Sequence, residues 1–142
     1  MPAPKKRTTE ADFSAVVRKS LPGASVTPLE SRATLGLPDL LVALPGRFAM
    51  VELKVSYAKM VYPRPHQVAF MVKHWELGCP VYMLARFRED DIWEKGDTRA
   101  VLFEGSKVPE LLKKHVDRVP PLGQWPIDKI DWHEMASLMD RR

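Results

Sequence analysis

The sequence has one cysteine, Cys79, among its 142 residues. A single thiol excludes an internal disulfide and a structural zinc site built from the cysteines of one chain, and it favours a reducing, intracellular setting. Because Cys79 lies between a predicted helix and a predicted strand, we expect a buried structural thiol there rather than a nucleophile. The sequence also lacks an apolar run approaching the roughly 20 residues of a membrane-spanning helix, so we expect no membrane span.

The composition is that of a globular protein, with 45% hydrophobic and 28% charged residues and no low-complexity tract. Its length suits one domain, which we place at residues 9–142, with a core over 25–104 and a C-terminal extension over 105–142. Residues 1–8 contain a Lys-Lys-Arg run with no apolar segment behind it, which predicts a flexible basic tail and not a secretory signal. The net charge of +4 is compatible with a polyanionic partner but does not establish one.

Hydrophobic periodicity and turn residues predict an α/β fold, with a central mixed sheet of about four or five strands flanked by helices. The expected elements are a helix over 9–21, strands over 25–33, 39–44 and 47–55, a helix from Pro65 to Gly78, and strands over 81–87 and 99–103. Pro28 favours an edge position for the first strand. In the last part of the chain we expect helices over 109–115 and 131–138, separated by the rigid extended segment PPLGQWP.

Charged residues interrupt the apolar stretch LGLPDLLVALPGRFAMVELK, which runs from Leu35 to Lys54. Glu52 and Lys54 are two residues apart and therefore share one face of their strand, where charges are costly unless they have partners. Asp39 opens the preceding strand, and a Pro-Gly turn separates the two strands. Asp39 and Glu52 lie about equally far from that turn, so hairpin pairing is expected to bring the two carboxylates together.

Two converging carboxylates and a backbone carbonyl, such as that of Leu53, form an oxygen-rich site suited to Mg²⁺. The ammonium of Lys54 would reach the same place, where it can stabilise negative charge at a phosphorus or help to orient and deprotonate water. This combination is typical of phosphodiester cleavage. Taken singly, each of these charges is an ordinary strand residue, and only the joint pattern favours a site.

Pro38-Asp39 followed by Glu52-Leu53-Lys54 resembles the signature of the PD-(D/E)xK nucleases. The chain is similar to the VRR-NUC branch of that superfamily, including its stand-alone phage and bacterial members, and to Holliday-junction resolvases. The segments that carry the similarity are 36–41, 48–54, 65–67 and 78–84, within a match over 30–86. The resemblance implies a restriction-endonuclease-like core.

The resemblance also implies roles for individual residues. Asp39 and Glu52 would be the metal carboxylates for Mg²⁺, with Mn²⁺ able to substitute, and the Leu53 carbonyl would complete the protein ligands. Lys54 would be the catalytic lysine, and Gln67 the helix residue that supports the site.

An additional upstream acid is implied, and two residues compete for the role. Glu30 is preferred, because the sequence from Glu30 to Leu40 resembles the phage-type pattern. Glu10, in the first helix, is the rival, since some resolvase-like members place the acid there.

The activity implied is that of a divalent-metal-dependent DNA endonuclease that leaves a 5′-phosphate and cuts junction, flap, nicked or other branched DNA. Symmetric cutting of a branch would call for a homodimer. Alternatives are a homing-type or weakly sequence-specific endonuclease, a non-catalytic nucleic-acid-binding protein on the same fold, and a structural protein. The candidate DNA contacts, each of which taken alone is better explained as an ordinary surface residue, are Arg32, Arg47, Lys59, Arg64 and His66. Tyr57 and Tyr62 are candidates for stacking on bases or for packing against the core.

Overall fold

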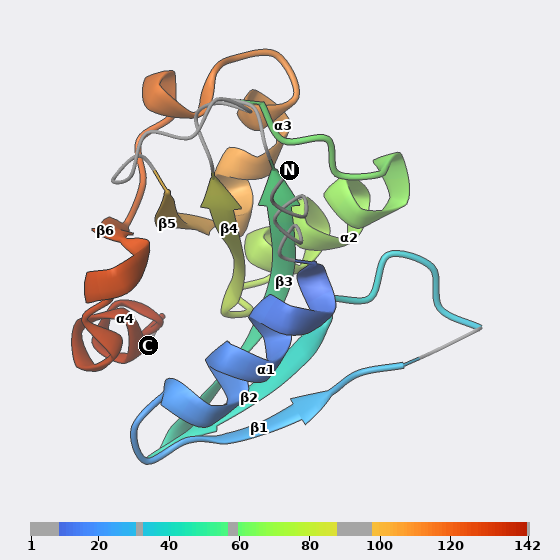
Figure 1. Ribbon diagram of the computed structural model, residues 1–142. Helices are drawn as coiled ribbons and strands as arrows, with labels where there is room; N and C mark the ends of the chain where they lie inside the picture. Colours follow the sequence, from blue (N-terminus) through green and yellow to red (C-terminus); the bar gives the residue numbers. More distant parts are fainter. Residues whose placement is uncertain (1–8, 31–32, 57–59, 88–97, 142) are drawn as a thin grey trace.

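The computed structural model describes residues 9–30, 33–56, 60–87 and 98–141 (Figure 1). The helices are α1 (Glu10–Ser20), α2 (Pro65–Glu76), α3 (Val108–Leu111) and α4 (Trp132–Leu138). The strands are β1 (Ser25–Pro28), β2 (Leu40–Leu44), β3 (Arg47–Ser56), β4 (Val81–Phe87), β5 (Arg99–Glu104) and β6 (Gly123–Pro126). None of the helices in the described part of the chain is long and apolar enough to cross a membrane.

All six strands form one sheet in the order β1-β2-β3-β4-β5-β6. The β3–β4 pair is parallel and the other pairs are antiparallel, so the predicted mixed α/β fold with flanking helices is confirmed. The expected number of strands was too low, because the segment predicted to be merely extended contains β6, which pairs with β5. β1 lies at one edge, as Pro28 indicated, and ends at that proline instead of continuing to Ala33.

The first two helices begin and end where the sequence signals lie. At the start of α1, the Thr9 side chain accepts a hydrogen bond from the Asp12 backbone N–H, and the Asp12 carboxylate accepts one from the Thr9 N–H. Pro65 occupies the first turn of α2, and Gly78, with a φ of +92°, follows its last turn. Local capping therefore fixes the start of both helices.

Helices cover both faces of the sheet. α1 and α4 pack on one face, where Phe13, Val17 and Met135 join Leu53 and other sheet residues in a first core. α2 and α3 pack on the other face, where Met71 and Leu111 join Met83 and its neighbours in a second core. In Figure 1, α1 crosses in front of the sheet and α2 lies behind it. Cys79 packs against the second core but is half-buried, and not buried as expected from the sequence.

β3 is the strand that presents charges beneath α2. Its residues alternate between the two faces, so Val51 and Leu53 enter the first core, whereas Met50 packs against the second. Glu52 and Lys54 follow Met50 on the α2 side. The side chain of Glu52 is consequently enclosed between the sheet and α2.

Side chains of arginine tie the C-terminal segment to the rest of the fold. The Arg47 guanidinium donates hydrogen bonds to the Ala136 carbonyl at 2.8 Å and the Met139 carbonyl at 3.4 Å, near the end of α4. The Arg141 guanidinium lies 3.7 Å from the ring centroid of Trp75 and donates to the backbone carbonyl of the same residue. These contacts explain why residues after 105 pack as part of the sheet structure.

Replacing Arg47 with alanine removes both hydrogen bonds to the end of α4. We expect the free energy of unfolding to fall by about 1–2 kcal/mol, because hydrogen bonds from a charged donor to partly buried carbonyls are lost. Chemical denaturation measures this change, and Arg18→Ala, on the exposed face of α1, is the control that should stay close to the parent protein. Equal stability of the two variants would contradict the assigned role of Arg47.

Candidate active site

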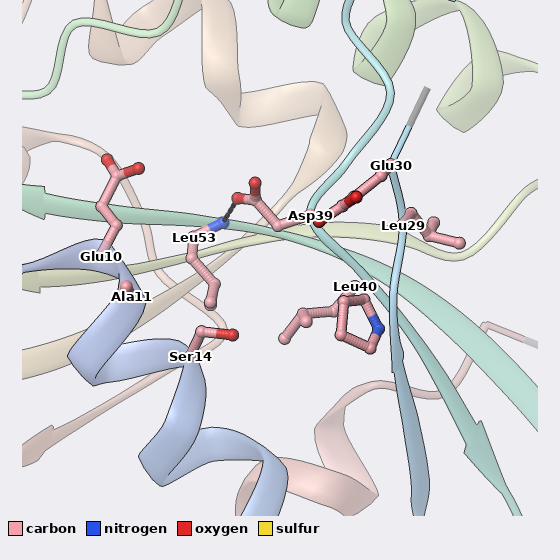
Figure 2. A pocket seen from close by; sticks show the side chains of 9 residues that line it. Glu10, Ala11, Ser14, Leu29, Glu30, Asp39, Leu40 and Leu53 are labelled. Carbon is pink, nitrogen blue, oxygen red and sulfur yellow. Dashed lines mark hydrogen bonds between the residues drawn. The ribbon is translucent and has the colours of Figure 1, made fainter. Parts of the chain in front are cut away.

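Hairpin register brings Asp39 and Glu52 to neighbouring positions. Leu40 pairs with Val51 at the start of β2, so the next pair outward is Asp39 and Glu52. The Asp39 carboxylate also accepts a hydrogen bond of 2.8 Å from the backbone N–H of Leu53, as Figure 2 shows. The β2–β3 ladder ends at Leu40, and beyond it the Asp39 side chain accepts a hydrogen bond from the β3 backbone. This bond holds the Asp39 carboxylate beside Glu52.

Glu52 is 1% exposed and is the one buried charged side chain among the described residues. Burial is the main influence that raises the pKa of its carboxyl well above the usual range, followed by the hydrogen bond to Asp39 and repulsion from that carboxyl. Lys54 acts in the opposite direction, and Glu10 adds to the increase. Without a cation, Glu52 therefore retains its proton at neutral pH.

Gln67 connects this pair to α2. Its side-chain amide donates a hydrogen bond of 3.1 Å to the Glu52 carboxylate and accepts one of 2.9 Å from the Arg64 backbone N–H. Because the amide oxygen is occupied by the helix N-terminus, the NH₂ group has to face Glu52. The residue predicted to support the site from a helix is thus in contact with it.

The backbone of Leu53 faces the space beside Asp39 and Glu52, which is called the gap below. In an antiparallel ladder the N–H and C=O of one residue point toward the same neighbouring strand. The Leu53 N–H points toward Asp39, so the Leu53 carbonyl is directed to that side as well. The Leu53 carbonyl, which is the predicted third oxygen ligand, therefore points from β3 toward the side on which Asp39 lies.

A cavity of about 240 Å³ opens beside Asp39, on the α1 side of the strand (Figure 2). Glu10 and Ser14 of α1 line it on one side, and Glu30 lines it beyond Asp39. Both candidates for the upstream acid thus border the same space as Asp39. Both acids are exposed to solvent, and Glu10 is close enough to raise the pKa of Glu52.

The donor set fits a hard divalent cation. The gap combines Asp39, Glu52 and the Leu53 carbonyl, which are all oxygen donors, and Lys54 favours the charged form of Glu52. No group of three or more His, Cys, Asp or Glu side chains in the described ranges is arranged to hold a metal ion. The oxygen donors of Asp39, Glu52 and Leu53 fit the chemistry of Mg²⁺, which uses few protein ligands and retains water or phosphate oxygens.

The structure does not bring all the predicted residues together. Arg47 begins β3 and Lys54 lies near its other end, roughly 20 Å away along an extended strand, and Arg47 is bonded to the carbonyls at the end of α4. Arg64 is the N-cap of α2 and His66 lies in its first turn, so both are next to Gln67 in the sequence. Arg32, Tyr57 and Lys59 fall outside the described residues.

Gly36 has a structural role that the sequence analysis missed. Its φ is +83°, and a Cβ at this position would lie 2.2 Å from the backbone oxygen of His66. The loop that leads to Asp39 therefore rests directly on the first turn of α2, which carries Gln67. The sequence showed a glycine before Pro38-Asp39, but not which segment would contact it.

No family model matches this chain, and the search of curated proteins found no match. Among solved structures, the chain is similar to Hjc, a Holliday junction resolvase from the archaeal hyperthermophile Archaeoglobus fulgidus, with 14% identity and a TM-score of 0.48. The similarity covers 69% of this chain and 74% of that chain. It is weak, so the function has to be inferred from the chain's own residues.

Glu52→Gln should change how stability depends on pH in EDTA. Folding raises the pKa of Glu52, so the unfolded chain loses this proton above about pH 4.3 while the folded protein retains it. This contribution to stability is complete below that pH. It falls by up to about 1.4 kcal/mol per pH unit as the pH rises toward the folded-state pKa.

The variant lacks the titrating group, keeps a partner for Gln67 and should gain stability relative to the parent protein between pH 5 and 8, on the order of a few kcal/mol at most. Urea denaturation across this pH range measures the difference. Parallel pH profiles for the two proteins would show that Glu52 is not held protonated.

Gly36→Ala should disturb the site more than Gly46→Ala, its matched control. Gly46 has a similar φ of +71° in the β2–β3 turn, but a Cβ there would have no atom within 4 Å. Both substitutions incur backbone strain of about 1–2 kcal/mol, and only Gly36→Ala adds a clash with α2. Denaturation curves should place Gly36→Ala clearly below Gly46→Ala in stability, and equal losses would contradict the contact.

Proposed function

We propose that this protein is a divalent-metal-dependent DNA endonuclease of the PD-(D/E)xK type. The observation that carries the proposal is a buried Glu52 beside Asp39, with the Gln67 amide hydrogen-bonded to it and Lys54 on the same strand face. Burial of Glu52 beside a second carboxyl is destabilising in the absence of a cation, which supports a functional reason for keeping the two together. The resemblance of Pro38-Asp39 and Glu52-Leu53-Lys54 to the PD-(D/E)xK signature supports the same assignment.

Asp39, Glu52 and the Leu53 carbonyl would hold Mg²⁺ or Mn²⁺. When bound, such a cation acts as a Lewis acid toward a phosphate oxygen and lowers the pKa of water. Glu52 would give up its proton as the cation enters, and Gln67 would keep the carboxylate oriented. Lys54 would stabilise negative charge on the phosphate or orient the attacking water.

In the proposed reaction, a water oxygen forms a bond to phosphorus and the P–O3′ bond breaks. The water gives up a proton and the departing O3′ gains one, so the products are a 5′-phosphate and a 3′-hydroxyl.

For the upstream acid, the proximity of Glu10 to Glu52 supports Glu10, contrary to the sequence-based preference for Glu30. Both acids line the cavity beside Asp39, and both are therefore included in the test.

Branched, flapped or nicked DNA is the proposed substrate, with the protein recognising DNA structure more than base sequence. Arg64 and His66 lie at the N-terminus of α2, where backbone N–H groups and the helix dipole also favour phosphate. Most such contacts go to the backbone and carry no sequence information. Symmetric cutting of a four-way junction would need a homodimer.

Purified protein incubated with linear, nicked, flap and four-way-junction DNA should cleave with Mg²⁺ or Mn²⁺ and should be inactive in EDTA. Glu52→Gln, Asp39→Asn and Lys54→Ala should each lower the cleavage rate by about 100- to 10,000-fold, since each removes a group that acts on the reacting centre. Ligation of the products tests for the 5′-phosphate. Glu10→Gln should reduce the rate more than Glu30→Gln.

Matched controls separate loss of the site from general damage. Glu76→Gln and Lys129→Ala alter exposed residues elsewhere on the chain and should leave cleavage unchanged. Binding without cleavage by the parent protein would favour the non-catalytic nucleic-acid-binding alternative. Cleavage retained by Glu52→Gln or Lys54→Ala would exclude the assigned site.

A further inference from the structure

Two large apolar side chains beside the candidate active site are unusually exposed. Leu35 is 70% exposed and Tyr62 is 72% exposed. Leu35 precedes Gly36 in the loop leading to Asp39, and Tyr62 lies two residues before Arg64, the N-cap of α2. Exposed apolar groups at a functional site commonly mark a binding surface.

Tyr62 is held outward by its neighbours. Val61 is 2% exposed and Pro63 is also buried, so residues on either side of Tyr62 anchor the backbone to the protein. Just before them, the Met60 carbonyl accepts a hydrogen bond of 2.7 Å from the Ser56 hydroxyl. A rigidly presented aromatic ring loses little conformational entropy on binding, which suits it to a stacking contact.

Leu35 is held next to the same part of the molecule. The close approach of Gly36 to the His66 backbone oxygen places the backbone next to Leu35 against the first turn of α2. Tyr62 lies two residues before the N-cap of the same helix, from which Gln67 reaches Glu52. Both exposed side chains are therefore carried by segments that meet at the start of α2, beside the candidate active site.

The charge around this surface favours a nucleic acid. Arg64 is exposed at the N-cap of α2, and His66 follows in its first turn. Positive groups that follow a backbone and an aromatic ring on which a base stacks are the two components of single-strand recognition. A continuous duplex keeps its bases stacked inside, so the ring can stack only where base stacking is interrupted.

We propose that Tyr62, assisted by Leu35, is a stacking platform for an unstacked base next to the scissile phosphate, and that it selects DNA with a nick, flap or branch. This inference rests on the proposed nuclease function and specifies its substrate class. A second copy of the chain is the competing occupant of the surface. The adjoining positive charge and the connection to Glu52 favour DNA.

Binding measured in Ca²⁺ by fluorescence anisotropy tests the platform, with a nicked duplex, a four-way junction and a continuous duplex of matched sequence. Tyr62→Ala should weaken binding to the nicked and junction DNA by about 5- to 150-fold, as expected for loss of one stacked base. Affinity for the continuous duplex should be unchanged, and Tyr62→Phe should retain the preference. Leu35→Ala should weaken the same two complexes, whereas Leu77→Ala, a control with the same 70% exposure, should not.

A 2-aminopurine placed at the interruption should lose fluorescence with the parent protein and Tyr62→Phe, but not with Tyr62→Ala. Unchanged affinity of Tyr62→Ala, or an equal loss on all three DNAs, would overturn the platform even if the parent protein cleaves DNA. Dissociation of a dimer by Tyr62→Ala, with DNA preference retained, would assign the surface to a second copy. Absence of DNA binding by the parent protein would overturn both the platform and the nuclease proposal.

Discussion

The constraint on which the site depends is the burial of the Glu52 carboxyl against that of Asp39. In the metal-free protein, burial of Glu52 and repulsion from Asp39 raise the pKa of Glu52, and a retained proton removes the repulsion between the two carboxyls. A divalent cation would neutralise the negative charge instead, by replacing the proton. The same burial that destabilises the free protein would therefore favour binding of a cation.

The fold maintains this pair through contacts from three directions. The β2–β3 hairpin sets Asp39 opposite Glu52, and the Leu53 N–H fixes the Asp39 carboxylate. From behind the sheet, α2 supplies the Gln67 amide. The loop before Asp39 meets α2 at Gly36, so the carboxylate and the amide are positioned by segments that touch each other. Precise placement thus follows from packing of regular elements and not from the flexible reach of long side chains.

The hairpin was predictable because its register depends on local information, namely the Pro45-Gly46 turn and the alternation along β3. Partners distant in sequence were not predictable. β6 is a strand because it pairs with the edge of β5, although its segment is rich in proline. Arg47 was predicted to lie near the site, but it begins β3 and therefore lies at the end of that strand far from Lys54. The contact of Gly36 with His66 and the outward display of Tyr62 likewise depend on tertiary packing.

Location of the cation is the most direct test of this account. Crystals grown with Mn²⁺ should give an anomalous difference peak between the carboxylates of Asp39 and Glu52, on the side of β3 to which the Leu53 carbonyl points. A fully occupied peak elsewhere, with no metal in contact with Asp39 or Glu52, would contradict it.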